Sequence, residues 1–152
     1  MYVDESARND DARGSSDIPA KRFAMKILLV DNSPTMRSIQ KKILESLAGA
    51  EFFEASDGLE ALTVLASVGG SVDVLLVEWN LPNLDGLTLV RKIREKDKKT
   101  PVIMFATEAV KPRIMDALKA GVNNFVVKPF TPEVLLEKLN ATLKKCQGQA
   151  AA

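Results

Sequence analysis

Short apolar runs alternate with longer amphipathic segments five times along the chain. The runs are too short for helices and are mostly apolar throughout, which is typical of strands buried on both faces. We expect strands at residues 27–30, 52–53, 74–77, 102–105 and 125–127. Strands and helices that alternate with short connections predict an α/β fold, a doubly wound, five-stranded parallel sheet with helices on both faces.

Two of the predicted helices begin with a hydroxyl residue followed by proline, at Ser33–Pro34 and Thr131–Pro132. The hydroxyl can cap free backbone N–H groups, and proline fits the first helical turn. Gly49 and Gly121 are expected to end the first and fourth helices. The expected buried stripes are Met36, Ile39, Ile43 and Leu47 in the first helix, and Leu135, Leu136, Leu139 and Leu143 in the last.

The two ends of the chain lack this pattern. Residues 1–24 are polar and show no hydrophobic period, so we expect a flexible N-terminal arm or an added extension there. The domain itself is expected to span residues 25–146. Residues 147–152 are rich in glycine and alanine and are expected to form a frayed tail.

Composition narrows the classes of function. A chain of 152 residues with 46% hydrophobic content suffices for one domain with a proper core. Its 21 basic and 20 acidic residues leave no charge excess to hold nucleic acid or a membrane surface. Histidine is absent, which excludes histidine metal sites, and the single Cys146 excludes an intrachain disulfide. No apolar run approaches ~20 residues and no signal segment opens the chain, so we expect a cytoplasmic protein.

Candidate chemistry lies where the predicted strands end. In doubly wound sheets, ligands bind at the carboxyl ends of the strands. The residues at those ends are Asp31 and Asn32, Glu78, Ala106 and Lys128. A functional site is therefore expected at these positions.

Three separated motifs carry a family resemblance. They are VDNSPTMR at residues 30–37, WNLPNLDG at 79–86 and KPF at 128–130. Together, over residues 26–145, they resemble the receiver domain of two-component response regulators, closest to the single-domain chemotaxis (CheY-like) type with its flavodoxin-like fold. The resemblance implies that the protein is not an enzyme in the ordinary sense, because family members catalyse only their own phosphorylation and dephosphorylation. The Lys-Pro bond of the third motif is commonly cis in the family.

The resemblance also assigns roles to individual positions. Glu78 stands where the family has its phosphoacceptor aspartate, and Lys128 matches the pocket lysine. Ala106 stands at the switch hydroxyl position and Phe125 at the switch aromatic position. The implied Mg²⁺ ligands are Asp31, Asn32, Glu78 and the backbone carbonyl of Asn80.

Four of these positions depart from the family pattern: Asn32 for an acid, Glu78 for aspartate, Ala106 for a hydroxyl residue, and Phe125 for the frequent tyrosine. Asn32 lowers the formal pocket charge from minus two to minus one, so Mg²⁺ is possible but should bind weakly. Glu78 carries its carboxylate about 1.5 Å farther into the pocket. A displacement on the order of 1 Å can cost ~100-fold in rate. Ala106 cannot donate a hydrogen bond to a phosphoryl group.

Glu78 allows several interpretations. It could be a built-in phosphate mimic, or the residue of a decayed, locked site in which it pairs with Lys128. We favour the second interpretation, because a mimic needs a hydroxyl partner and Ala106 offers none. An introduced substitution in a working receiver is a further alternative, although Asn32 and Ala106 argue against a single change.

Three functions remain open. The leading hypothesis is a pseudo-receiver, a monomer whose phosphorylation is absent or impaired. It would bind a histidine kinase or a motor or signalling protein through its fourth helix, fifth strand and fifth helix (residues 111–120, 123–127 and 131–145). The alternatives are a working phospho-receiver that takes a phosphoryl group onto Glu78, and a scaffold or small-ligand domain that has reused the pocket. No segment predicts a helix-turn-helix, so direct transcriptional control is not expected.

Basic residues gather at the end of the third predicted helix: Arg91, Lys92, Arg94, Lys96, Lys98 and Lys99. They could contact an acidic partner. A solvated helix end is the commoner reason for such a run, since cations also favour the helix dipole there.

Overall fold

The computed structural model describes residues 25–47, 49–108 and 110–151. Its strands are β2 (Lys26–Val30), β3 (Glu51–Ala55), β4 (Val74–Glu78), β5 (Val102–Ala106) and β6 (Asn124–Val127). Its helices are α2 (Pro34–Leu44), α3 (Gly58–Ser67), α4 (Gly86–Arg94), α5 (Lys111–Ala120) and α6 (Pro132–Ala151). Strand and helix alternate five times, as predicted. The predicted N-terminal arm, residues 1–24, lies outside the described residues.

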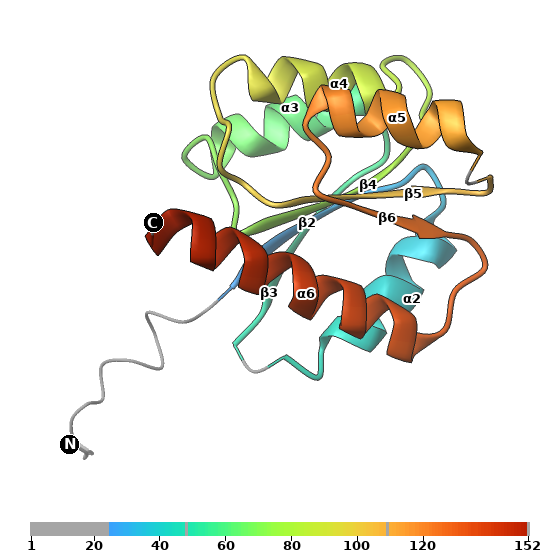
Figure 1. Cartoon of the computed structure of the whole chain (residues 1–152), viewed down its shortest axis with the longest axis vertical. Helices are drawn as coiled ribbons and strands as arrows, with labels where there is room; N and C mark the ends of the chain where they lie inside the picture. The colour runs from blue at the N-terminus through green and yellow to red at the C-terminus, as the bar shows by residue number, and fades with distance from the viewer. Residues whose placement is uncertain (1–24, 48, 109, 152) are drawn as a thin grey trace.

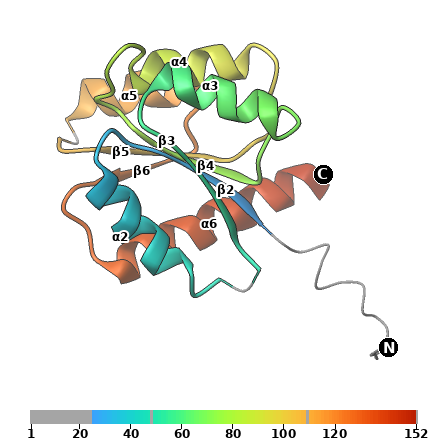
Figure 2. The ribbon, with the colours of Figure 1, turned by 180° about the vertical axis from the view of Figure 1, so that it is seen from behind.

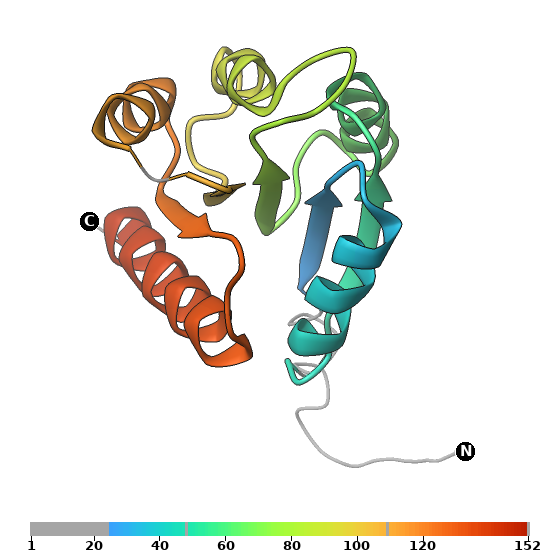
Figure 3. The same ribbon diagram turned by 90° about the vertical axis from the view of Figure 1, so that its right-hand side faces the viewer.

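The five strands form one parallel sheet in the order β3-β2-β4-β5-β6. Helices α3, α4 and α5 cover one face, and α2 and α6 cover the other (Figures 1 and 2). Figure 3 shows the sheet between these two helical layers. The predicted doubly wound, flavodoxin-like fold is confirmed.

The strands alternate between two hydrophobic cores. Leu75, Val77 and Met104 pack under α3, α4 and α5, whereas Leu76 and Phe105 pack under α2 and α6. Both faces of the central strands are therefore buried, which explains why these strands are continuous apolar runs in the sequence.

The predicted stripe of α2 is confirmed only in part, since Ile43 and Leu47 are partly buried and pack against the core. Gln40 and Leu44 are the buried residues of α2, whereas Ile39 is 44% exposed. The helix already ends at Leu44, so Leu47 lies beyond it. Because α2 contacts both β2 and α6, the face buried by Gln40 and Leu44 was decided by that packing and not by hydrophobic spacing. The stripe of α6 is confirmed: Leu135 and Leu139 are fully buried, and Leu136 and Leu143 are partly buried against the same core.

The last helix continues past the expected end of the domain. It runs through Gly148 to Ala151, so the tail expected from residue 147 is helical over most of its length. Alanine has the highest helix propensity, and a single glycine near a helix end costs only about 1 kcal/mol. No helix in the described ranges is both long and apolar enough to cross a membrane.

Candidate functional site

A cluster of charged side chains, which we call the pocket, lies at the carboxyl ends of the central strands. Asp31 follows β2, Glu78 ends β4, and Lys128 follows β6. In the sheet, β2 and β4 are neighbours, and β5 separates β4 from β6. The parallel arrangement therefore brings together three residues that are far apart in the sequence.

The Lys128 ammonium bridges the two acids. Its Nζ lies 2.9 Å from Asp31 Oδ2 and also forms an ion pair with Glu78 Oε1. Asp31 and Glu78 are buried, and the Lys128 side chain is only 15% exposed. Since a buried ion is stable only when its charge is compensated, each of the three groups needs the others.

The pKa of Lys128 reflects this pairing. Burial alone would lower it, but the hydrogen bonds and charges of Glu78 and Asp31 outweigh burial and raise the pKa above its ordinary value of 10.5. The ammonium therefore stays charged at neutral pH. With two carboxylates and one ammonium, the formal charge of this group is minus one.

Backbone donors occupy the remaining carboxylate oxygens. Glu78 Oε2 accepts a hydrogen bond from the backbone N–H of Asn80 at 3.0 Å. Asp31 Oδ1 accepts one from the N–H of Ser33 at 2.9 Å. All four oxygens of the two acids therefore have a partner within the protein, and both side chains are held in one orientation.

Arg37 holds the loop that carries Asp31, a role that the sequence did not predict. Its Nη1 donates a hydrogen bond to the backbone carbonyl of Asp31. Its Nε donates to Glu54 Oε1 at 2.8 Å, and Lys41 also pairs with Glu54. Arg37 thus ties the loop that carries Asp31 to β3. It lies inside the first sequence motif, four residues after the predicted helix cap, which was the signal available.

The loop after β4 is held close to the pocket. The N–H of Gly86 donates to the carbonyl of Trp79 at 2.9 Å, and the side chain of Asp85 caps α4 through the N–H of Thr88 at 2.8 Å. A Cβ at position 86 would lie 2.2 Å from the carbonyl oxygen of Glu78. Only glycine allows the start of α4 to approach the end of β4 this closely.

Neither Ala106 nor Phe125, the two predicted switch positions, carries a polar side-chain group. Ala106 is completely buried, and its backbone carbonyl accepts a hydrogen bond from the N–H of Lys128 at 2.8 Å. Phe125 is partly buried, and its ring lies 6.5 Å from that of Trp79. The guanidinium carbon of Arg113, on α5, lies 4.9 Å from the centre of the Trp79 ring. The aromatic residues therefore join the pocket loop to α5 without a hydroxyl group.

The donor set does not fit a tight Mg²⁺ site. Mg²⁺ prefers an octahedron of oxygens with one or two carboxylates. Here Asp31 and Glu78 both face the Lys128 ammonium, and Asn32 is exposed and uncharged. No group of three acidic, cysteine or histidine side chains suited to a metal occurs within the described ranges. A cation would have to compete with an ammonium that already lies between the two acids.

The Lys128–Pro129 peptide bond is cis, as the family pattern implied. Of the predicted pocket residues, the structure brings together Asp31, Glu78 and Lys128, with the Asn80 backbone beside them. Phe125 is instead grouped with Trp79.

Known proteins match this chain in sequence over most of its length. The sequence pattern of the response regulator receiver domain matches residues 27–140. The chain is 47% identical over 130 residues to a chemotaxis protein CheY homolog of Campylobacter jejuni, covering 84% of this chain and 99% of that protein. It is 47% identical over 121 residues to chemotaxis protein CheY1 of Helicobacter pylori, covering 78% of this chain and 97% of that protein.

A solved structure agrees in shape. Chemotaxis protein CheY4 of Vibrio cholerae superposes with a TM-score of 0.71 at 32% identity, covering 78% of this chain and 98% of that one. The fold, the arrangement of charges at the carboxyl ends of the strands and these relatives agree: the chain belongs to the family of response regulator receiver domains.

Proposed function

We propose that this protein is a chemotaxis-type receiver that signals by protein contact and whose phosphorylation is absent or severely impaired. The observation that carries the proposal is the bridge from Lys128 to both Asp31 and Glu78. It supports a locked pocket, in which the charges that would serve phosphoryl transfer already neutralise one another.

Three features of the pocket support this interpretation. Glu78 presents its carboxylate about 1.5 Å beyond the reach of an aspartate, directly onto Lys128. An incoming phosphodonor would have to break this pair, and a displacement on the order of 1 Å already costs ~100-fold in rate. Ala106 offers no hydrogen bond to a phosphoryl oxygen, so a modified Glu78 would lack its usual readout. Mg²⁺ should bind weakly, because its ligand positions include the uncharged Asn32.

The proposed output surface is the face of α5, β6 and α6. Four of the six exposed large hydrophobic residues in the described ranges lie on α5, just before it, or on β6: Val110, Met115, Leu118 and Val127. An apolar group on a monomer surface often marks a site of protein contact. The names of the bacterial relatives suggest a chemotaxis partner, such as a histidine kinase or a motor protein. A monomeric state and a cytoplasmic location remain predictions.

Tryptophan fluorescence tests the state of the pocket. Trp79 is the only tryptophan and directly follows Glu78, so occupancy should change its emission. The titration adds Mg²⁺ and then beryllofluoride, a phosphoryl mimic, to three proteins. They are the parent, Glu78→Asp, and the triple variant Asn32→Asp, Glu78→Asp, Ala106→Thr. We expect no saturable change in the parent and a saturable change in the triple variant.

The other outcomes distinguish the remaining hypotheses. Saturation by the parent would contradict the proposal and favour a working phospho-receiver. A response of Glu78→Asp equal to that of the triple variant would show that Glu78 alone blocks the pocket. Circular dichroism of each variant verifies that it is folded.

A second experiment separates signalling from scaffolding. Met115→Ser and Leu118→Ser on α5 should abolish co-purification of the signalling partner from cells, whereas Ile39→Ser on α2 should not. Retained binding by the α5 variants would favour a scaffold that uses another surface.

Incubation with a small-molecule phosphodonor, followed by mass spectrometry, reports directly on whether Glu78 accepts a phosphoryl group.

A further inference from the structure

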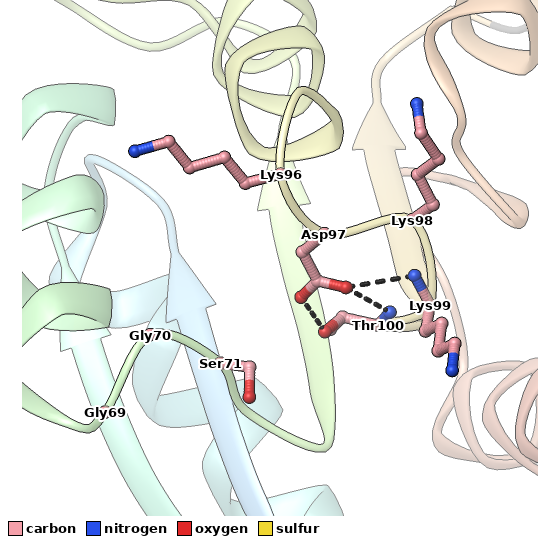
Figure 4. A pocket seen from close by; sticks show the side chains of 8 residues that line it. All are labelled: Gly69, Gly70, Ser71, Lys96, Asp97, Lys98, Lys99 and Thr100. Carbon is pink, nitrogen blue, oxygen red and sulfur yellow. Dashed lines mark hydrogen bonds between the residues drawn. The ribbon is translucent and has the colours of Figure 1, made fainter.

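An open groove lies at the amino-terminal ends of the strands, at the opposite edge of the sheet from the pocket. It has a volume of 710 Å³ and runs between the loop before β4 and the loop before β5. Figure 4 shows its lining, which consists of Gly69, Gly70 and Ser71 on one side and Lys96, Asp97, Lys98, Lys99 and Thr100 on the other. Nothing in the receiver function described above uses this groove.

The groove carries a net positive charge that its own residues do not neutralise. Lys96, Lys98 and Lys99 are exposed, and none forms an ion pair with another residue in the described part of the chain. Lys98 Nζ donates only to the carbonyl of Arg94, at 3.3 Å. Lys96 extends over the groove toward the side of Gly69 and Gly70 (Figure 4). The groove therefore offers free ammonium groups to an anionic ligand.

The acid in the groove wall is already engaged. Asp97 accepts hydrogen bonds from the N–H groups of Lys99 at 2.9 Å and Thr100 at 3.0 Å, and from the Thr100 hydroxyl. Burial would raise its pKa, but the hydrogen bonds from Thr100 and Lys99 hold the pKa of Asp97 below its ordinary value. Asp97 thus shapes the loop, and among the described residues it forms no ion pair with the neighbouring lysines.

One wall of the groove, the loop before β5, is held in place by Arg94. Arg94 donates to the carbonyls of Asp97 at 3.0 Å, Thr100 at 2.7 Å and Gly121 at 2.9 Å. These bonds tie the end of α4 to the loops before β5 and β6. A wall that is fixed in this way loses little conformational entropy when the groove binds a ligand.

An apolar strip adjoins the lysines. A second hollow of 290 Å³ shares Gly70, Lys96 and Asp97 with the groove and continues between α3 and α4. Its apolar lining includes Leu62, Leu65 and Ile93. A fitting ligand would therefore combine negative charge with an apolar side chain.

The start of the described chain lies beside this groove. The N–H of Lys26 donates to Asp73 Oδ2 at 2.7 Å, and the N–H of Asp73 donates to the carbonyl of Lys26 at 2.9 Å. Asp73 is two residues from Ser71 in the groove lining. Strand β2 is the neighbour of β4, so the loop before β5 is two strands away, about 10 Å across the sheet.

The residues before this point have the complementary chemistry. Residues 1–17 contain five acids, Asp4, Glu5, Asp10, Asp11 and Asp17, against two arginines, which is a net side-chain charge of −3. The groove lining has three lysines and one aspartate, a net of +2. Ile18 directly follows Asp17 and places an apolar side chain next to an acid. From Met25 back to Asp17, the chain can span up to roughly 27 Å, which exceeds the spacing of about 10 Å between β2 and β5.

We propose that residues 4–18 of this chain bind in the groove between the loops before β4 and β5, with their acids on Lys96, Lys98 and Lys99. The interaction is intramolecular, and a short tether gives an effective concentration in the millimolar range. Weak, salt-sensitive charge pairs are then sufficient to keep the segment bound for much of the time. The proposal is independent of whether the pocket can be phosphorylated.

Paramagnetic relaxation enhancement measures this contact in the full chain. The native thiol is removed by Cys146→Ser, and a spin label is attached at Ser15→Cys in ¹⁵N-labelled protein. We expect the amide signals of residues 69–71 and 96–100 to lose about half of their intensity at low salt. The Debye length falls to about 3 Å at 1 M salt, so the signals should recover there. The amides of residues 80–83, at the other end of the strands, serve as an internal control.

Two matched variants make the result decisive. Asp10→Asn with Asp11→Asn and Asp17→Asn, or Lys96→Glu with Lys98→Glu and Lys99→Glu, should each restore the lost intensity, whereas Lys144→Glu on α6 should not. Intensity loss confined to residues 26–27 and 73 would reflect only the tether and would overturn the proposal. An intensity loss that persists in the Asp→Asn variant would also overturn the proposal. In a mixture, one copy carries the spin label without ¹⁵N and the other carries ¹⁵N without the spin label. An intensity loss that appears only in this mixture would assign the groove to a second copy and would also contradict the proposal.

Discussion

The two edges of the sheet hold their cations in opposite ways. At the carboxyl ends of the strands, Lys128 is largely buried and lies between two buried acids. At the amino ends, Lys96, Lys98 and Lys99 are exposed and form no ion pair with another described residue. A buried charge is costly without a partner, whereas an exposed one is solvated by water. The charges of the pocket therefore compensate one another, whereas the groove lysines can bind an anionic ligand.

Removing the buried cation should give the largest effect. Lys128→Met leaves Asp31 and Glu78 facing each other without compensation, so we expect a loss of about 3 kcal/mol in the free energy of unfolding at neutral pH. Urea unfolding followed by circular dichroism measures it. Lys144→Met, an exposed lysine on α6, is the matched control and should change stability by less than about 0.5 kcal/mol. Equal losses in the two variants would show that the bridge contributes no stability.

The same variant tests the direction of the pKa shift. The pKa of Lys128 is raised in the folded protein by Glu78 and Asp31, against the effect of burial. Its stabilising contribution is therefore complete below the ordinary value of 10.5 and is lost as the pH rises through the higher, folded-state pKa. The stability of the parent should fall more steeply than that of Lys128→Met above about pH 10.5. Parallel curves would contradict the pairing.

Two glycines, one near each end of the strands, differ in how tightly they are packed. Gly86→Ala should cost roughly 3 kcal/mol, because the new Cβ would lie 2.2 Å from the Glu78 carbonyl oxygen. At the groove, Gly70 has a φ of +99° and no atom within 4 Å of a built Cβ. Gly70→Ala should therefore cost roughly 1 kcal/mol, from backbone strain alone. Thermal and urea unfolding of both variants check the order, and a reversed order would contradict the tight approach of α4 to β4.

Arg94 differs from the lysines that follow it, because it is held by hydrogen bonds to backbone carbonyls. Arg94→Ala removes donors to three backbone carbonyls and should cost roughly 2 kcal/mol. Arg94→Lys should recover only part of this loss, because an ammonium cannot reproduce the fork of the guanidinium. Hydrogen exchange of the amides of residues 97–100 should increase in both variants. Unchanged exchange would mean that the loop does not depend on Arg94.

The groove lysines should have the smallest effect on stability. Lys98→Glu with Lys99→Glu should change the free energy of unfolding by less than about 0.5 kcal/mol, because both side chains are exposed. A loss comparable to that of Arg94→Ala would show that these lysines are structural and not free for binding. Urea unfolding of the double variant decides between the two.

Much of the fold follows from local patterns. Every predicted strand is present. The central strands are buried on both faces and so appear as continuous apolar runs such as Leu75–Val77, whereas the edge strand β3 is only partly buried. The burial of Gln40 on α2 was not predictable, since it results from contacts with other elements and not from hydrophobicity. The six basic residues at the end of α4 and just after it looked alike in the sequence. In the structure, Arg94 binds backbone carbonyls, whereas Lys96, Lys98 and Lys99 line a groove.

The sequence by itself determined the order of strands and helices, the family, and the residue types at the ends of the strands. These properties depend on near neighbours in the chain and on the chemistry of single side chains. Only the tertiary structure decided that Lys128, which was expected to pair with Glu78, also bridges to Asp31, 97 residues away. It also decided that the groove lysines form no ion pair with another described residue. The reason is physical: whether two charges meet depends on the positions of distant strand ends and on side-chain length, and no local pattern in the sequence carries that information.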